Sequence, residues 1–311
     1  MPIKFAIECA LEYELLGPCE FIFCLQIPET PHQTILSENL IVDGAQIVGE
    51  YKEPTLGNRL LRVSGLPGVL KLDYTANIVL SHQQADPNRL MEHAVKDLPV
   101  EVLSYLLPSR YCQSDQLLNF AIQEFGHLSP GYLRVQSVCN WVHQYVRFIP
   151  GTTQSSTSAL EILSNRTGVC RDFTHLTIAL LRALSIPARF VAGYDYGADP
   201  SLGPTDFHAY VEAYIENRWY IFDPSGLCPR PGLVRIATGR DAADCAFATT
   251  YGVAQYKNML INIQPYDMKG EAFEIEDNLN MALSTAGRDN NPEWLPYLPA
   301  MKAIDHSVLT Q

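Results

Sequence analysis

The spacing of apolar residues changes near residue 108, and this change limits the folds that the chain can adopt. From residue 69 to residue 80 the even positions are apolar and most odd positions are polar. A period of two predicts a β-strand with one buried face. Further short strands are predicted at residues 21–27, 34–42, 45–51 and 60–64. Several short strands separated by turns predict an N-terminal antiparallel β-sandwich.

Beyond residue 108 the apolar residues recur at helical spacing. Val135, Val138 and Val142 share one face of a predicted helix. Cap and proline signals predict helices from Ser114 to about Phe125, from Ser129–Pro130 through Tyr145, and from a capping box at Ser158–Glu161 to Gly168. Strands follow between residues 207 and 223. Helices followed by strands in one stretch predict an α+β fold.

These signals divide the chain into three parts. We expect a β-rich domain at residues 1–107, an α+β domain at 108–255, and a C-terminal part at 256–311. The last part is expected to contribute a strand at 259–263 and an extended proline-rich tail at 292–299 that packs on the body. We also expect residues 108–311 to fold without the first domain.

The charge of the chain excludes several functions. With 22 basic and 34 acidic residues the net charge is −12, which disfavours nucleic acid as a partner, because non-specific binding needs basic residues. The sequence has no apolar run of about 18 residues, so no membrane-spanning helix is predicted. Glu8, Glu12 and Glu14 argue against a signal peptide, and we expect a cytoplasmic location.

One of the eight cysteines stands in a setting that favours reactivity. No Cys-x-x-Cys pair exists, so no zinc site at the usual spacing is predicted, and most cysteines are expected to be buried thiols. Cys170, however, begins an apolar helical pattern that runs to Leu184 and ends before Pro187. The first turn of a helix favours the thiolate, which is the nucleophilic form. The alternative is a buried thiol that starts a core helix.

A predicted hairpin supplies a histidine and a carboxylate. Strands at 207–215 and 218–223 are joined by Glu216–Asn217. With a two-residue loop, Tyr210 lies opposite Asp223, and His208 is then a diagonal neighbour of Asp223 on the same face. That geometry suits a carboxylate that holds one imidazole nitrogen while the other faces a nucleophile. Taken singly, His208 could be an ordinary strand histidine and Asp223 a turn residue.

Together these segments resemble the transglutaminase-like superfamily, whose core is papain-like. The matching elements are a Gly-x-Cys helix start at 168–170, Leu-Arg-Ala-x-x-Ile-Pro-Ala-Arg at 181–189, His-Ala at 208–209 and Asp-Pro at 223–224. The resemblance implies a cysteine nucleophile at Cys170, a base at His208 and an orienting acid at Asp223. It also implies acyl chemistry through a thioester. Two departures, Tyr210 after His-Ala and Ser225 after Asp-Pro, are expected not to contact the reacting groups.

Other residues near these motifs receive weaker assignments. The backbone N–H of Cys170 is one expected oxyanion donor, and Gln154 is the candidate for a second. His175 and Trp141 are expected to be structural residues. Asp172, in the first turn, is expected to interact with the helix dipole or to pair with an arginine. No Asp-x-Asp-x-Asp-Gly loop is found, so we expect no metal and no cofactor.

Two functions remain open at this point. The leading hypothesis is a cysteine protease-like amide hydrolase or acyltransferase that acts on peptides or proteins. The alternative is a non-catalytic module that keeps the fold in order to bind a partner protein. The sequence does not decide between hydrolysis and transfer to an amine, and it leaves the oligomeric state open.

Overall fold

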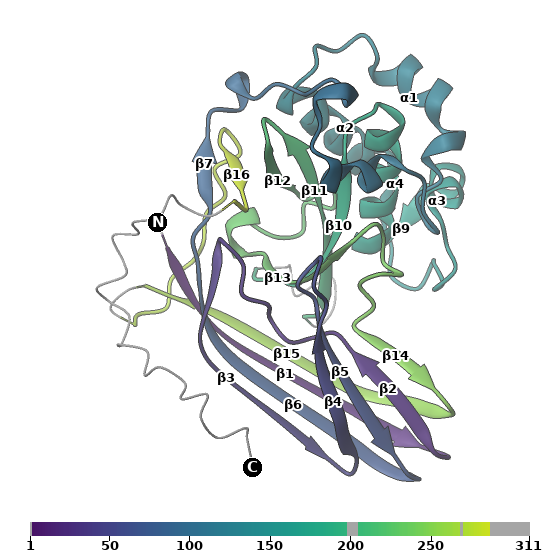
Figure 1. The fold of residues 1–311 in the computed structure, drawn as a ribbon, viewed down its shortest axis with the longest axis vertical. Coiled ribbons are helices and arrows are strands. Elements are labelled where there is room, and N and C mark those ends of the chain that lie inside the picture. The colour runs from purple at the N-terminus through teal and green to yellow at the C-terminus, as the bar shows by residue number, and fades with distance from the viewer. Residues whose placement is uncertain (1, 198–204, 268–269, 287–311) are drawn as a thin grey trace.

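The computed structural model describes residues 2–197, 205–267 and 270–286. Figure 1 shows two halves: a β-sandwich of long strands at the bottom and a helix-covered sheet above it. A single cluster of buried apolar side chains continues through both halves. In the described part of the chain, the longest helices have 14 residues, and none is long and apolar enough to cross a membrane.

The first sheet of the sandwich has the order β15-β1-β6-β3 and is antiparallel. Its strands are β1 Ile3–Leu15, β3 Gln33–Asp43, β6 Gly68–Leu80 and β15 Ala254–Tyr266. The predicted alternation is confirmed, since every even position of β6 from Leu70 to Leu80 is buried. The predicted strands omit β1, although its odd positions from Phe5 to Leu15 are buried by the same alternation.

The second sheet has the order β14-β2-β5-β4. Its strands are β2 Cys19–Phe23, β4 Gln46–Lys52, β5 Arg59–Gly65 and β14 Ala248–Tyr251. Aromatic rings bridge the two sheets, because Tyr13 of β1 lies 5.2 Å from the ring of Phe21 and 6.0 Å from that of Phe23. These contacts bury the apolar faces of both sheets, as the sandwich prediction requires.

Strand pairing crosses the boundaries that the sequence suggests. β14 lies within the stretch 108–255, yet it pairs with β2 in the sandwich. β15 pairs with β1 along nearly its whole length, and β7 Gln83–Ala85 leaves the first stretch to join the upper sheet. Hydrogen bonds between strands that are far apart in the sequence therefore determine which segments belong to the sandwich and which belong to the upper sheet. The proline-rich tail at 292–299 lies outside the described residues.

The upper half is a six-stranded antiparallel sheet with helices packed on it. The strand order is β13-β10-β11-β12-β16-β7. The further strands are β10 Ala188–Tyr194, β11 Phe207–Ile215, β12 Arg218–Phe222, β13 Val234–Gly239 and β16 Ala282–Ser284, with a short parallel pair β8 Arg147–Phe148 and β9 Thr167–Gly168. The central helix α4, Cys170–Ala183, packs against β10 and β11 and is buried from Asp172 onward.

The remaining helices surround α4 (Figure 1). They are α1 Leu118–Phe125, α2 Tyr132–Tyr145 and α3 Ala159–Asn165, with short 3-10 turns at Pro87–Arg89, Val95–Asp97, Val100–Leu106, Ser114–Gln116 and Arg230–Gly232. The capping box of Ser158 and Glu161 is confirmed, because the Ser158 N–H donates to the Glu161 carboxylate at 2.8 Å.

Three predicted helix ends are wrong by a few residues. Ser114 begins a 3-10 turn, and α1 begins only at Leu118. Gly131, with φ 145°, precedes α2, so Ser129–Pro130 does not start that helix. Arg166, in the left-handed region at φ 59°, ends α3 in place of Gly168. A local cap signal competes with tertiary contacts at each of these ends.

Candidate active site

The start of α4 places Cys170 at the first helical position. The Asp172 carboxylate accepts hydrogen bonds from the Val169 N–H at 3.0 Å and from the Thr153 hydroxyl at 2.7 Å, and so holds the turn before the helix. A Cβ at Gly168 would lie 2.7 Å from the Cβ of Asp172, which explains the glycine. Arg171 pairs with Asp172 at 3.0 Å, as expected for that acid. Cys170 is partly exposed, unlike the other seven cysteines, which are buried.

The hairpin has the predicted register. Glu216 and Asn217 both have positive φ, 47° and 60°, which is the type I′ turn that joins two strands by two residues. Ile215 pairs with Arg218 and Val211 with Phe222. Asp223 follows the last residue of β12 and thus comes beside His208 of β11.

The contact between the histidine and the acid is direct. His208 Nε2 lies 3.2 Å from Asp223 Oδ2, and both side chains are at most 2% exposed. The other carboxylate oxygen, Oδ1, accepts bonds from the Ser225 N–H at 2.9 Å and the Ser225 hydroxyl at 2.6 Å. The expectation that Ser225 does not contact the reacting groups is therefore wrong, because Ser225 fixes the orientation of Asp223.

These contacts shift two pKa values in opposite directions. Burial alone would lower the pKa of His208, but the charge of Asp223 and hydrogen bonds to Asp223 and Cys170 raise it well above the ordinary value. Burial alone would raise the pKa of Asp223, yet the nearby His208 and the two bonds from Ser225 lower it. The buried site thus favours an imidazolium held against a carboxylate.

Helix and sheet are locked together next to the reacting groups. The Thr174 hydroxyl, one turn after Cys170, donates to the carbonyl of Ala209 at 3.0 Å. Interaction with Cys170 is one of the contributions that raise the pKa of His208. Because Nε2 of His208 is engaged by Asp223, Nδ1 is the nitrogen left for the thiol. The structure therefore brings all three residues Cys170, His208 and Asp223 into one site.

A second carboxylate, which sequence reasoning did not assign, lies on the other side of the histidine. Gly193 of β10 pairs with His208, so Asp195, two residues further, is its diagonal neighbour. Asp195 Oδ2 lies 3.5 Å from His208 Nδ1, and Asp195 is 5% exposed. The sulfur of the buried Cys228 lies within 4.8 Å of an Asp195 carboxylate oxygen. The signal that could reveal Asp195 is the β10–β11 pairing, which the sequence does not state.

A cavity of about 540 Å³ opens beside Cys170. Cys170, Arg171 and His208 line one part of it, and Gln154 lies across from the helix start in the loop 151–155. Apolar walls come from β10, β11 and the segment that leads into β14, namely Phe190, Ala192, Phe207, Ala246, Phe247 and Ala248. The rings of Phe207 and Phe247 stack with centroids 4.6 Å apart. The connection to the sandwich thus forms one wall of the cleft.

Backbone donors are available at the helix start. The first intrahelical bond of α4 runs from the Asp172 N–H to the Val169 carbonyl at 2.8 Å. The N–H groups of Cys170 and Arg171 precede that bond and so have no acceptor within the helix. Gln154 is exposed, and its backbone carbonyl accepts from Arg171 at 2.6 Å. Gln154 is placed in the cleft, and its role as an oxyanion donor stays a prediction.

The residues expected to be structural lie in packed surroundings. His175 is fully buried, stacks on Tyr111 at 4.9 Å and accepts the Ala242 N–H at 3.2 Å. Burial lowers the pKa of His175 well below its ordinary value. Trp141 stacks on Tyr145 at 4.3 Å. Neither side chain lines the cleft beside Cys170.

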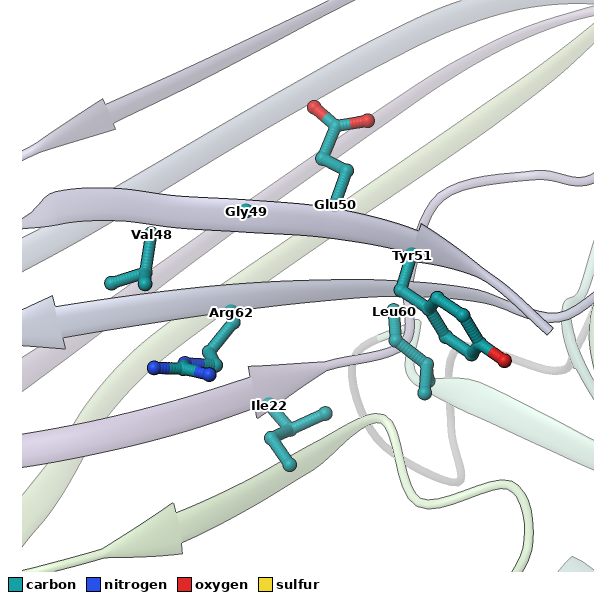
Figure 2. Close-up of a pocket in the computed structure, with 7 residues that line it drawn as sticks. All are labelled: Ile22, Val48, Gly49, Glu50, Tyr51, Leu60 and Arg62. Atoms are coloured by element: carbon teal, nitrogen blue, oxygen red, sulfur yellow. The ribbon is translucent and has the colours of Figure 1, made fainter.

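A separate depression of about 300 Å³ lies on the outer face of the sandwich. Figure 2 shows Ile22, Leu60, Val48 and Tyr51 around it, with Glu50 pointing away from Arg62. It contains no cysteine or histidine. This depression therefore offers no cysteine nucleophile and no histidine base.

An α+β core that carries Cys, His and Asp at a helix start and two neighbouring strands is the architecture of papain-like thiol proteins. Two family models match the chain: the transglutaminase-like superfamily core over residues 121–224 and the bacterial transglutaminase N-terminal domain over residues 3–101. A crystal structure described as that of a "Putative Cysteine Protease from Cytophaga hutchinsonii" is 40% identical, with a TM-score of 0.83, over 91% of this chain and 98% of that chain. The chain belongs to the transglutaminase-like superfamily.

Curated relatives from mycobacteria match more distantly. An uncharacterized protein of Mycobacterium leprae is 34% identical over 117 residues, which are 36% of this chain and 42% of that protein. Uncharacterized proteins of Mycobacterium bovis and Mycobacterium tuberculosis are 28% identical over 232 residues, or 69% of this chain. The chain spans 63% of the length of these two relatives.

Proposed function

We propose that the protein is a cysteine-dependent amide hydrolase or acyltransferase that forms a thioester on Cys170. The observation that carries the proposal is that Cys170 shares one cleft with a buried His208, which Asp223 holds at 3.2 Å. Cys170 is partly exposed and lines a cavity, which a nucleophile requires and a core thiol does not. The same observation disfavours a purely binding role for the fold.

Each residue has a defined part in the proposed reaction. The Cys170 thiolate attacks the carbonyl carbon of an amide, and the N–H groups at the start of α4 stabilise the oxyanion. The His208 imidazolium gives its proton to the departing amine, the C–N bond breaks, and a thioester remains. Neutral His208 then accepts a proton from water or from a second amine, which attacks the thioester and releases Cys170.

The substrate in this proposal is a peptide or protein side chain. The apolar walls of the cleft, with the stacked pair of Phe207 and Phe247, suit an acyl group with an apolar flank. Whether water or an amine completes the cycle depends on what can reach the thioester. We propose no specific sequence for the substrate.

The experiment is a screen of acyl peptides with and without a labelled primary amine, read by mass spectrometry. Amine incorporation by the wild type that Cys170→Ala abolishes defines a transferase, and peptide cleavage alone defines a hydrolase. Cys139→Ala, which removes a buried thiol of α2 outside the cleft, is the matched control. Equal turnover by Cys170→Ala would overturn the proposal.

Asp223→Asn tests the arrangement of the site independently. The amide keeps the size of the side chain but favours the wrong imidazole tautomer, so kcat is expected to fall by about 10⁴-fold. Circular dichroism and the melting temperature should show a retained fold. Near wild-type turnover would mean that Asp223 serves only the turn at Pro224 and that the proposed role of His208 is wrong.

We further propose that the protein works in a reducing compartment such as the cytoplasm. All eight cysteines are free thiols, and free thiols persist where glutathione and thioredoxin keep them reduced. Fractionation of cells that express the native gene, with an antibody against the chain, tests this proposal.

A further inference from the structure

Three side chains beside the candidate active site converge on one point. A carboxylate oxygen of Asp195, a ring nitrogen of His208 and the sulfur of Cys228 all lie within 4.8 Å of one another. The three residues are 5%, 3% and 7% exposed, respectively. Asp195 Oδ1 is buried and has no hydrogen-bond partner. A buried carboxylate oxygen without a partner is costly, and it points to a ligand that the cluster is able to bind.

We propose that Asp195, His208 and Cys228 form a binding site for Zn²⁺. Carboxylate oxygen, imidazole nitrogen and thiolate sulfur are the three zinc ligand types, and the sulfur disfavours Ca²⁺ and Mg²⁺. Zinc bonds of about 2.0–2.3 Å in a tetrahedron put ligand atoms roughly 3.3–3.8 Å apart. The three side chains therefore need to approach by about 1 Å, within the reach of their rotamers. Three protein ligands leave a fourth position open.

The surroundings of His208 support this assignment. A zinc-bound histidine usually donates its second ring N–H to a carboxylate, which fixes the tautomer. Here Nε2 already contacts Asp223 at 3.2 Å, while Nδ1 faces Asp195 at 3.5 Å. Asp223, itself held by Ser225, is thus placed as the outer partner of a histidine that binds the metal through Nδ1. On binding, the Cys228 thiol and Nδ1 of the His208 imidazolium each release a proton to solvent.

Cys228 and Asp223 border a second cavity, of about 410 Å³, together with residues of the segments 226–230 and 277–279. Cys170, Arg171 and His208 line the substrate cleft. The proposed zinc ligands therefore lie between two cavities.

Zinc at this site would remove the base from the reaction. The metal occupies the Nδ1 lone pair, so His208 can neither accept the thiol proton nor return it to a leaving group. The result is reversible inhibition, relieved by a chelator. This consequence rests on the proposed function, whereas zinc binding itself does not.

The experiment titrates the full chain with ZnCl₂ against a chromophoric chelator. Wild type and Cys170→Ala are both expected to bind one equivalent with affinities within about threefold. Cys228→Ala, Cys228→Ser and Asp195→Asn should bind at least 10-fold more weakly, since even outer-shell partners affect zinc affinity by 10–100-fold. Cys245→Ala, which removes another buried thiol at the cleft, is the matched control and should bind as the wild type does.

Cobalt(II) gives a second measurement on the same variants. A thiolate-to-cobalt charge-transfer band should appear with the wild type and Cys170→Ala and be absent from folded Cys228→Ser. Zinc binding that needs Cys170 but not Cys228 would overturn the site, as would failure of the wild type to bind one equivalent. If zinc binds as expected while no acyl substrate is turned over, the site stands and the proposed function fails.

Discussion

At the scale of single residues, the site depends on how His208 is held. His208 lies between carboxylates from both neighbouring strands, Asp223 at 3.2 Å and Asp195 at 3.5 Å. Ser225 then fixes Asp223 through two hydrogen bonds. These contacts fix the orientation of the His208 imidazole ring. That orientation determines which ring nitrogen faces Cys170.

The reactivity of Cys170 gives a prediction at this scale. A brief pulse of iodoacetamide at pH 6 should label Cys170 far ahead of the other cysteines. Cys170 alone is partly exposed, and it contacts a His208 whose pKa is raised, so that the imidazolium stabilises the thiolate. Burial raises the pKa of Cys9, Cys24 and Cys112 to about 12, so these thiols lack both access and charge.

Peptide mass spectrometry measures this labelling. His208→Ala should remove most of the advantage of Cys170, because only the helix start then favours the thiolate. His127→Ala, at an exposed position of the loop after α1, is the matched control. Labelling spread evenly over several cysteines would mean that Cys170 is an ordinary core thiol.

At the scale of secondary-structure elements, the β11–β12 hairpin determines whether His208 and Asp223 meet. A turn longer or shorter by one residue would move Asp223 to the other face of the sheet. The observed turn has two exposed residues with positive φ, and Glu216 is held by hydrogen bonds to and from the Met91 backbone. Asparagine tolerates that conformation better than most residues.

Asn217 tests the turn. Asn217→Val should lower the free energy of unfolding by about 1–2 kcal/mol, because a β-branched residue fits poorly at φ 60°. Asn217→Gly, the matched control, should be at least as stable as the wild type, since glycine is favoured at the second central position of a type I′ turn. Urea unfolding measures both. Equal stability of all three proteins would show that the turn does not adopt the I′ conformation.

At the scale of the whole molecule, the sandwich is built from both ends of the chain. β1 pairs with β15 from Lys4–Tyr266 to Leu15–Ala254, and β2 pairs with β14. The first 107 residues alone lack two strands of the sandwich. Removing those residues leaves β15 with a long unpaired edge and an apolar face in water.

Splitting the chain tests this architecture. Residues 108–311 expressed alone should aggregate, whereas co-expression with residues 1–107 should restore a soluble complex that co-purifies through the β1–β15 pairing. The chain is cut between residues 107 and 108, which are exposed, so the cut itself removes few contacts of the folded protein. A cooperative thermal transition of 108–311 alone would support an independent domain instead.

The junction of the two halves should also be sensitive to acid. His82 lies between β6 of the sandwich and β7 of the upper sheet, and its ring stacks on His32 at 5.1 Å. Burial, followed by the charge of Arg235, lowers the pKa of His82 to about 4. The unfolded chain takes up this proton near the ordinary pKa of about 6.5, so stability falls as the pH falls from about 6.5 to 4.

His82→Gln measures that contribution. The wild type should lose up to about 3 kcal/mol more than His82→Gln between pH 7 and pH 4. Chemical unfolding at a series of pH values gives the two slopes. The exposed His127, replaced by Gln, should leave the slope of the wild type unchanged. Parallel slopes for the wild type and His82→Gln would show that His82 is protonated in the folded protein.

Features that depend on local spacing could be predicted from the order of the residues. The alternation in β6, the start of α4 at Cys170 and the register of the β11–β12 hairpin all follow from residues close together in the chain. The helix start and the hairpin also place Cys170, His208 and Asp223, which explains why those three residues could be found. The ends of two helices differ from the predicted ones, because Gly131 precedes α2 and Arg166 ends α3, whereas neighbouring residues carry the cap signals that the prediction used.

Contacts between segments that are far apart in the chain are visible in the folded protein and could not be predicted. The pairing of β1 with β15 joins residues about 250 positions apart, and no local pattern records such a partner. Asp195 and Cys228 approach His208 from separate segments, so their convergence appears only when the sheet is assembled. Local periodicity reports which face of an element is buried, whereas long-range pairing depends on the free energy of the whole fold.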